Sequence, residues 1–228
     1  MIRIITDSAS DIVDNRREDL TVLPVSITFG SEEFRDGITL THEAFYEKLI
    51  ECDALPVTSQ VAPFAFEEAF REAVEAGGQV IAITLSSKLS GTYQSACIGA
   101  EGFGGKVRVV DSENASIGQH ALVEYALRLK DAGLGFEEIV ERLEADKKRI
   151  RLIALLDTLE YLKKGGRISK AAAMAGSLLS IKPVIAIQCG EVAILGKARG
   201  SKQGNNLLAE QIRQTGGIDF EKPFVLGY

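Results

Sequence analysis

Small polar residues follow three apolar runs of strand length, and they are the first groups in the sequence that could do chemistry. These segments are Asp7-Ser8, Ser86-Ser87 and Asp111-Ser112. Ligands of parallel sheets bind beyond the carboxyl ends of the strands. If the chain forms such a sheet, the two aspartates could converge there with Asp11 on Mg²⁺ or Mn²⁺ for phosphoester hydrolysis. Asp and Ser also cap the helices that follow strands, and the sequence leaves both interpretations open.

A loop rich in hydroxyl groups is predicted between two helices in the first third of the chain. It runs from Leu55 to Gln60, and its Pro56 disfavours continuation of the preceding helix. Thr58 and Ser59 carry the hydroxyl groups of this loop.

A second hydroxyl-rich loop, Leu85–Gln94, connects a predicted strand to a predicted helix. Ser90 is a favourable N-cap for that helix, and the free N–H groups of a first helical turn point to where an anion would sit. With Gly91 and Thr92 it forms a Ser-Gly-Thr turn that can hold a carboxylate or a phosphate through neutral donors. A well-capped helix without a ligand accounts for the same residues.

Arg167 is the one charged residue of a glycine loop that could reach such an anion. It lies between Gly166 and Ile168, and a guanidinium offers two parallel donors to a carboxylate or phosphate. A solvated loop arginine is the alternative interpretation.

The familiar phosphate-binding and hydrolase motifs are missing from the sequence. The span from Gly190 to Gly196 is one residue too wide for a Walker A loop. No dinucleotide fingerprint follows a strand, and there is no G-x-S-x-G elbow and no H-E-x-x-H. Only two histidines occur, His42 and His120, so a serine hydrolase with a histidine base is poorly supported.

The cysteines and the apolar segments indicate the compartment. Cys52, Cys97 and Cys189 are scattered along the chain without a C-x-x-C spacing, which favours a reducing environment over disulfides or a metal cluster. The N-terminus does not resemble a signal peptide, and Lys182 and Pro183 interrupt the most apolar stretch. We therefore predict a cytoplasmic protein without an integral membrane segment.

Length and charge narrow the class of protein further. The chain has 228 residues, of which 46% are hydrophobic, and a formal net charge of −6. This composition excludes a disordered chain and argues against an obligate nucleic-acid binder. The charge is uneven, because residues 1–146 carry 12 basic and 26 acidic side chains whereas residues 147–202 carry 12 basic and 3 acidic ones. The basic segment could attract an acidic partner.

Apolar runs alternate with segments of helical spacing in the first two-thirds of the chain. We predict strands at Ile2–Thr6, Val22–Phe29, Gln79–Thr84 and Lys106–Val110. The clearest helical pattern begins at Phe136 and places apolar residues at i, i+3, i+4 and i+7. Such alternation predicts an α/β fold with a mostly parallel sheet covered by helices.

The pattern changes near residue 150, where we place a domain boundary. Residues 1–150 form the predicted N-terminal α/β domain, and residues 151–228 form a smaller α/β domain that ends on a predicted strand and therefore looks truncated. Its expected elements are strands at Leu152–Leu156, Lys182–Gln188, Val192–Ala198 and Pro223–Tyr228, and helices at Thr158–Lys164, Lys170–Gly176 and Asn205–Gln214. The second and third of these strands read as a hairpin.

Five motifs together resemble the DegV family of bacterial fatty-acid-binding proteins. They occur in order along essentially the whole chain, at Ile5–Asp11, Pro56–Gln60, Ser86–Ala96, Leu159–Ile168 and Ile181–Pro183. The resemblance implies a two-domain α/β fold with a long-chain fatty acid in an apolar tunnel between the domains. It also implies a non-catalytic protein without a cofactor, which presents its lipid to a separate ATP-dependent fatty acid kinase that makes acyl-phosphate for phospholipid synthesis.

The resemblance also assigns roles to individual residues. Thr58 and Ser90 are the expected carboxylate-binding positions, and Arg167 is the basic group nearby. The full set of expected ligand-binding residues is Thr58, Ser59, Ser90, Gly91, Thr92 and Arg167. No catalytic residue and no metal ligand is expected in this set.

Two further expectations follow from the resemblance. The basic surface around Lys170 and Arg199 would face the kinase. The family's pattern continues beyond Tyr228 and carries a histidine near its C-terminus that helps to hold the carboxylate. Neither His42 nor His120 lies in the equivalent region, so either the chain is truncated or its head-group site is incomplete.

Overall fold

A four-stranded parallel sheet forms the centre of the computed structural model, which describes residues 1–13, 15–52, 55–168 and 181–227. The strand order of this central sheet is β2-β1-β6-β7. Its strands are β1 (Ile2–Asp7), β2 (Leu20–Leu23), β6 (Gln79–Thr84) and β7 (Val107–Asp111). A short 3₁₀ turn, η1 (Ser8–Ser10), follows β1. The predicted α/β class with a parallel sheet is confirmed.

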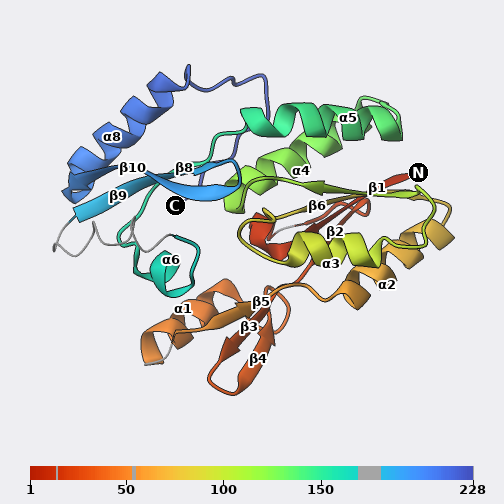
Figure 1. Cartoon of the computed structure of the whole chain (residues 1–228), viewed down its shortest axis with the longest axis horizontal. Coiled ribbons are helices and arrows are strands. Elements are labelled where there is room, and N and C mark those ends of the chain that lie inside the picture. Colours follow the sequence, from red (N-terminus) through yellow and green to blue (C-terminus); the bar gives the residue numbers. More distant parts are fainter. Residues whose placement is uncertain (14, 53–54, 169–180, 228) are drawn as a thin grey trace.

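Helices cover both faces of the central sheet (Figure 1). They are α2 (Pro63–Glu75) and α3 (Thr92–Gly99) on one face, and α4 (Ser116–Asp131) and α5 (Phe136–Asp146) on the other. A 3₁₀ turn, η2 (Lys147–Arg149), continues α5. Because both faces are covered, the inner strands read as unbroken apolar runs instead of alternating ones.

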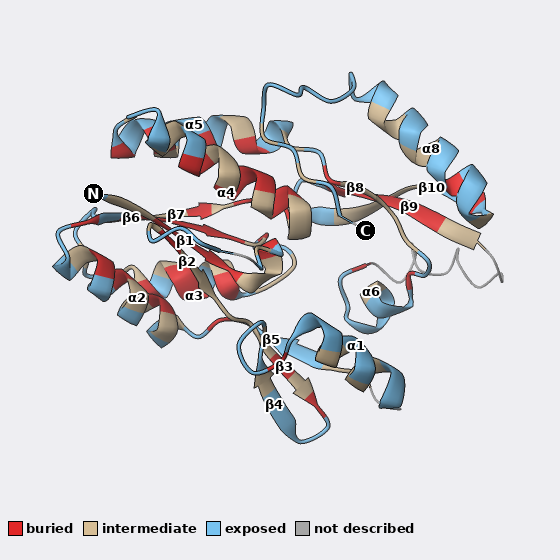
Figure 2. Cartoon of the chain, turned by 180° about the vertical axis from the view of Figure 1, so that it is seen from behind, coloured by how far each residue is buried: buried red, intermediate tan, exposed pale blue. Residues whose placement is uncertain are grey.

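Alternate residues of β6 feed two separate apolar cores. Ile81 packs in the cluster beneath α4 and α5, which includes the fully buried Leu122. Its neighbour Ala82 packs in the cluster beneath α2, around Phe66 and Phe70. Figure 2 shows these inner strands and the helix faces toward them as buried. The carboxyl ends of the strands, and the loops that follow them, are therefore held on a rigid base.

The segment predicted as one strand, Val22–Phe29, forms two strands in two different sheets. β2 ends at Leu23, and β3 (Ser26–Phe29) pairs antiparallel with β4 (Glu32–Arg35) and β5 (Val57–Ser59). The prediction was wrong because Pro24 interrupts the run, and proline has no N–H with which to continue a ladder. The side chain of Ser8 takes the next free donor, the N–H of Val25, at 3.1 Å.

This small sheet (β3–β5) and helix α1 (His42–Glu51) form a separate unit beside the central sheet (Figure 1). The sequence did not predict β4, and it placed β5 in a loop. Charged residues dominate β4, and all three residues of β5 are exposed, so neither strand has the apolar pattern of a core strand. The buried core of this unit consists of Ile27, Phe29 and Leu40.

A third sheet, the C-terminal sheet, contains β8 (Ile153–Leu155), β9 (Ile181–Gln188) and β10 (Glu191–Arg199) in antiparallel order β10-β9-β8. Helix α8 (Gly200–Gln214) covers one face and α6 (Glu160–Lys164) lies toward the other (Figure 1). The predicted hairpin is confirmed. Cys189 and Gly190 both have positive φ angles, 50° and 82°, as a two-residue type I′ turn requires. The domain boundary near residue 150 stays a prediction.

Two predictions for the C-terminal region were wrong. Helix α8 begins at Gly200 instead of Asn205. Its Gly204 packs so closely on Leu155 that a Cβ there would lie 2.7 Å from Leu155 Cδ1, and glycines used in this way hide a helix from sequence patterns. Residues 223–227 form no strand, because in the described part of the chain they pair with no neighbouring strand. The predicted helix Lys170–Gly176 lies outside the described residues.

Within residues 1–13, 15–52, 55–168 and 181–227, no helix is both long enough and apolar enough to cross a membrane.

Candidate functional site

The loop from β6 to α3 ends in a pair of hydroxyl groups. Ser90 Oγ accepts the main-chain N–H of Thr92 at 3.2 Å, and the two side-chain oxygens lie 3.0 Å apart. Ser90 is partly buried and Thr92 is buried. Helix α3 begins at Thr92 with Gly91 in the N-cap position. The predicted cap at Ser90 is therefore one residue early, although its side chain satisfies a first-turn N–H as a cap does.

Thr58 and Ser59 lie on β5, where their side chains are exposed. The next residue, Gln60, connects this strand to α3, because its Nε2 donates to Ser95 Oγ at 2.7 Å. A Cβ added at Gly91 would lie 1.9 Å from Gln60 Oε1, so glycine allows this close approach. The end of the Thr58 strand thus contacts the turn that follows Ser90.

Arg167 approaches the same loop from the C-terminal part of the chain. Its Nε donates to the carbonyl of Leu89 at 3.3 Å, and its Nη1 donates to the carbonyl of Gly165 at 2.6 Å. The guanidinium is exposed. The structure therefore places Arg167 against the residue that precedes Ser90, with part of its fork already used by main-chain carbonyls.

The hairpin of the C-terminal sheet contacts this loop as well. Ser86 Oγ donates to the carbonyl of Gly190 at 2.7 Å, and it accepts the N–H of Lys88 at 3.2 Å. A Cβ at Gly190 would lie 2.6 Å from Ser86 Oγ. The β6–α3 loop is thus the place where the central sheet and the C-terminal sheet meet through named hydrogen bonds.

A buried carboxylate holds the beginning of this loop. Asp7 Oδ2 accepts the N–H of Leu85 at 2.8 Å and Nε2 of Gln119 at 3.1 Å, while Oδ1 accepts the N–H of Ala9 at 3.1 Å. Burial raises the pKa of Asp7 to about 6, against the lowering effect of these hydrogen bonds. Desolvation therefore outweighs three donors at this position.

The other two aspartates considered as metal ligands are also occupied. Asp111 accepts the N–H of Ser87 at 3.2 Å and that of Glu113 at 2.9 Å, and Asp11 accepts the hydroxyl of Ser116. Asp7 and Asp111 thus act as caps and loop anchors, which agrees with the simpler of the two interpretations. Among the described residues no group of three or more His, Cys, Asp or Glu side chains is placed to hold a metal ion.

Sequence reasoning missed Gln60, Gln119 and Gly190 as parts of this site. Gln60 belongs to a motif that the sequence pointed to, but its role depends on a contact with a helix 35 residues away. Gln119 lies on α4 and is fully buried, which is unusual for glutamine. Nothing in the linear pattern indicates that burial.

Of the two residues expected to face a partner, the structure describes only Arg199, and this residue is not part of the cluster. Arg199 is exposed at the last position of β10, at the opposite end of that strand from the hairpin turn, and its N–H donates to Gln203 Oε1 at 3.1 Å. Lys170 lies outside the described residues.

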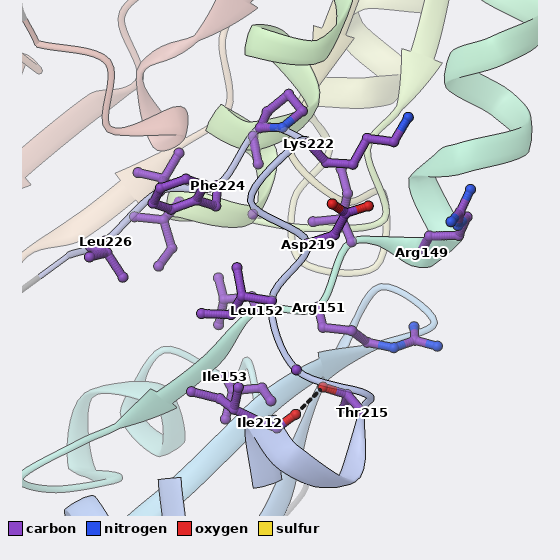
Figure 3. Close-up of a pocket in the computed structure, with 18 of the residues that line it drawn as sticks. Arg149, Arg151, Leu152, Ile153, Ile212, Thr215, Asp219, Lys222, Phe224 and Leu226 are labelled. Atoms are coloured by element: carbon purple, nitrogen blue, oxygen red, sulfur yellow. Dashed lines mark hydrogen bonds between the residues drawn. The ribbon is translucent and has the colours of Figure 1, made fainter. Parts of the chain in front are cut away.

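A separate cavity of about 700 Å³ lies between α4, the segment before β8, α8 and the segment after α8. The charged ends of Arg149, Arg151 and Lys222 extend along one side of it, whereas Phe224 and Leu226 lie on the other (Figure 3). None of the residues predicted to bind a ligand lines this cavity. The hydroxyl cluster and the cavity are therefore two distinct places on the molecule.

Comparison with known proteins gives a consistent result for sequence and fold. The sequence model described as "Uncharacterised protein, DegV family" matches residues 1–225. A DegV domain-containing protein of Caldanaerobacter subterraneus subsp. tengcongensis is 36% identical over 222 residues, which are 96% of this chain and 79% of the relative.

Two solved structures extend the comparison. A DegV family protein from Thermus thermophilus, described by its fatty acid binding, has a TM-score of 0.86 and 36% identity over 94% of this chain and 77% of its own. The Streptococcus pneumoniae Fatty Acid Kinase (Fak) B3 protein loaded with linoleic acid has a TM-score of 0.85 and 27% identity, over 94% of this chain and 79% of its own. With the family match over nearly its whole length, the chain belongs to the DegV family.

Proposed function

We propose that this protein binds a long-chain fatty acid between its two predicted domains and presents the carboxylate to a separate fatty acid kinase. In this proposal Thr58 and Ser90 hold the carboxylate, and Ser59, Gly91, Thr92 and Arg167 complete its surroundings. The observation that carries the proposal is the contact of Gln60 with α3. It sets two hydroxyl-bearing segments, from two different sheets, against each other.

The relatives support the class of ligand and of partner. The Thermus thermophilus protein is described as fatty-acid-binding, and the Streptococcus pneumoniae protein was solved with linoleic acid and is called a fatty acid kinase B protein. Both share the fold of this chain over 94% of its length.

The energetics of such a ligand divide between its two ends. Burial of an acyl chain contributes about 0.8 kcal/mol per methylene, or roughly 11 kcal/mol for some fourteen methylenes, before entropy costs. Hydrogen bonds to the head group add about 1–3 kcal/mol. The tail therefore dominates affinity, while Thr58 and Ser90 decide which end of the lipid is presented.

Neutral hydroxyl donors suit a carboxylate that must react. A carboxylate locked to a buried arginine would be a poorer nucleophile toward ATP than one held by hydroxyls. Arg167 is exposed and donates to two main-chain carbonyls, so it supplies positive charge near the carboxylate while the hydroxyls make the contacts. Phosphoryl transfer itself belongs to the kinase, and this chain is proposed to be non-catalytic.

The partner is proposed to approach the basic segment, residues 147–202, including Lys170 and Arg199. This segment carries 12 basic and 3 acidic side chains, and a positive field both attracts an acidic protein and accommodates the charge of an acyl-phosphate. We place this exchange in the cytoplasm, where thiols such as Cys52, Cys97 and Cys189 stay reduced.

The direct test is denaturing extraction of the purified protein followed by mass spectrometry for free fatty acid. Titration with palmitate and with hexadecanol, the matching alcohol, then separates recognition of the head group from burial of the tail. We expect a bound fatty acid and a clear preference for palmitate. An empty protein that ignores added palmitate, or equal retention of acid and alcohol, would contradict the proposal.

The double variant Thr58→Ala, Ser90→Ala tests the two positions themselves. We expect palmitate binding to weaken by about 1–3 kcal/mol, because two donors to a charged group are lost, without unfolding of the protein. Ser87→Ala is the matched control, since Ser87 lies on the same loop with an exposed side chain. An unchanged palmitate affinity in the double variant would show that these hydroxyls do not hold the carboxylate.

A further inference from the structure

The loop that carries Ser90 starts from one buried carboxylate. Asp7, at the end of β1, accepts the N–H of Leu85 at 2.8 Å, and Leu85 is the first residue after β6. From there the main chain turns directly to Ser90, whose N–H donates to the carbonyl of Ser86 at 3.1 Å. The position of the Ser90 hydroxyl therefore depends on a tight turn that Asp7 holds at its first residue.

Gln119 is the third member of this arrangement, and one of its atoms lacks a partner. Its Nε2 donates to Asp7 Oδ2 at 3.1 Å and to Thr6 Oγ1 at 3.0 Å. Its Oε1 is buried and has no hydrogen-bond partner. A buried acceptor without a donor is energetically unfavourable. Since Nε2 of the same amide bonds Asp7, a rotation of the amide would turn the unpaired oxygen toward the Asp7 carboxyl.

We propose that Asp7 and Gln119 are positioning residues for the carboxylate site, with two states that differ in how firmly the Leu85–Ser90 turn is held. In the first state the ionised Asp7 accepts the Leu85 N–H and the Gln119 amide N–H. In the second state, Asp7 Oδ2 has taken up a proton from solvent and the Gln119 amide has rotated. The protonated Asp7 then donates a hydrogen bond to Gln119 Oε1, and the hydrogen bond from the Leu85 N–H weakens. The inference rests on the proposed function for its consequence, which is that lipid is held less firmly in the second state.

The surroundings of Asp7 favour a transition near neutral pH. Burial raises its pKa to about 6, and hydrogen bonds from Leu85, Gln119 and Ala9 oppose this rise. The charged or titratable groups on the elements around it are Arg3 on β1, Asp11 after η1, Lys88 in the loop, Arg108 and Asp111 on β7, and six residues of α4, namely His120, Glu124, Tyr125, Arg128, Lys130 and Asp131. In the described part of the chain none of them shares a hydrogen bond or an ion pair with Asp7. The turn is therefore held fully at pH values above about 7 and released below about 5.

Hydrogen exchange of the Leu85–Ser90 amides in the lipid-free full chain tests the two states. After correction for intrinsic rates, we expect exchange in wild type to rise about tenfold between pH 7.5 and pH 5. Asp7→Asn should remove this pH dependence, and Asp11→Asn, a matched change without a bond to the loop, should keep it. A flat wild-type profile, or the same profile in Asp7→Asn, would overturn the proposal.

Gln119→Met keeps the test decisive if Asp7→Asn does not fold. Methionine removes both the amide donor to the ionised carboxylate and the amide oxygen that accepts from the protonated one. Because the hydrogen bond to the charged group is the stronger of the two, the midpoint of the wild-type transition should move upward by about one pH unit. A purely structural role for Gln119 would lower protection at every pH without moving the midpoint. An unmoved midpoint would therefore overturn the assignment of Gln119.

Palmitate affinity separates this inference from the proposed function. The ratio of the palmitate Kd at pH 5 to that at pH 7.5 should be about tenfold larger in wild type than in Asp7→Asn. Protonation of palmitate itself affects both proteins equally, so it cancels in this comparison. Equal ratios would show that the turn does not govern the carboxylate site. If palmitate fails to bind at any pH, the proposed function is wrong, whereas the exchange profiles still decide whether Asp7 holds the turn.

Discussion

The two hydroxyl-bearing segments of the candidate site are supported in very different ways. The Leu85–Ser90 loop follows a strand that is buried from Val80 to Thr84, and it is held by Asp7, by Asp111 and by the carbonyl of Gly190. β5, which carries Thr58, is exposed along its whole length and belongs to a small sheet with a buried core of three residues.

This difference shows how one site can combine precision with freedom to move. The β6–α3 loop is fixed by the central sheet, whose apolar clusters lie on both of its faces. The small sheet is connected to the central part of the molecule by the main chain and by Gln60, which follows β5 and donates to Ser95 on α3. We expect local opening to begin in the unit with fewer buried apolar contacts, so Thr58 would be the more mobile of the two proposed carboxylate-binding positions.

Phe29→Ala should have the largest effect on the difference in stability between the small sheet and the central sheet. Phe29 is 4% exposed and packs edge-on against Phe34 and Phe45, with ring centroids 6.3 and 5.7 Å away. Its truncation should lower the free energy of opening of the small sheet by about 3–5 kcal/mol. Hydrogen exchange should show loss of protection in β3–β5 and α1 while the central sheet keeps its own. Phe70→Ala, in the core of the central sheet, is the control and should weaken protection throughout that sheet. Equal loss in both units after Phe29→Ala would contradict the separation.

The titration of Asp7 gives the next largest effect. Its pKa is raised from 3.8 to about 6 by burial, so between these values the folded chain binds a proton that the unfolded chain has released. The free energy of unfolding should therefore fall by about 3 kcal/mol, from Asp7 alone, as the pH rises from about 4 to above 6. Denaturant unfolding at both pH values gives the free energy of unfolding of wild type and of Asp7→Asn. The difference between the two proteins should change by this amount between the two pH values. A difference that stays constant with pH would show that Asp7 titrates normally.

Gly91→Ala should damage the junction between the two segments. The new Cβ would meet Gln60 Oε1, and the displaced side chain would lose its hydrogen bond to Ser95. We expect palmitate affinity to fall about tenfold and stability by about 1 kcal/mol. Gln60→Ala removes both the clash and the hydrogen bond, so the double variant should be no weaker than Gln60→Ala alone. Additive losses would mean that Gly91 acts through another neighbour.

Ser86→Ala tests how the loop is anchored, and unlike Gly91→Ala it leaves the contact between Gln60 and α3 in place. It removes the donor to the Gly190 carbonyl and the acceptor of the Lys88 N–H. We expect a loss of about 1–2 kcal/mol in the free energy of unfolding and faster exchange in the β9–β10 turn. Ser87→Ala is the control and should be nearly neutral. Unchanged exchange in that turn after Ser86→Ala would show that the hairpin is held by other contacts.

Sequence patterns predicted the parts of this fold that are buried regularly. We predicted the strands that begin near Ile2, Gln79 and Lys106 and the helix at Phe136, because continuously or periodically buried positions carry apolar residues. β4, β5 and the first turn of α8 were not found. The two strands are mostly exposed, and α8 has Gly204 at a close contact where a helix pattern would have an apolar residue.

The sequence pointed to the segments that form the candidate site, but not to the residues that hold these segments in place. Thr58, Ser90 and Arg167 stand in recognisable motifs, and the structure brings their segments together. Gln60, Gln119 and Gly190 act through contacts made by residues 35, 112 and 104 positions away. Such partners are set by the packing of elements, for which one sequence alone carries no pattern.

The tight β9–β10 turn has a mechanical consequence for the whole molecule. The hydroxyl of Ser86, four residues before Ser90, donates to the carbonyl of Gly190 in this turn, and Arg167 donates to the carbonyl of Leu89. Any tilt of the C-terminal sheet relative to the central one must therefore pull on both sides of a single short turn. A protein that docks against the C-terminal sheet would in this way act on the position of Ser90, the residue proposed to hold the carboxylate, without touching it.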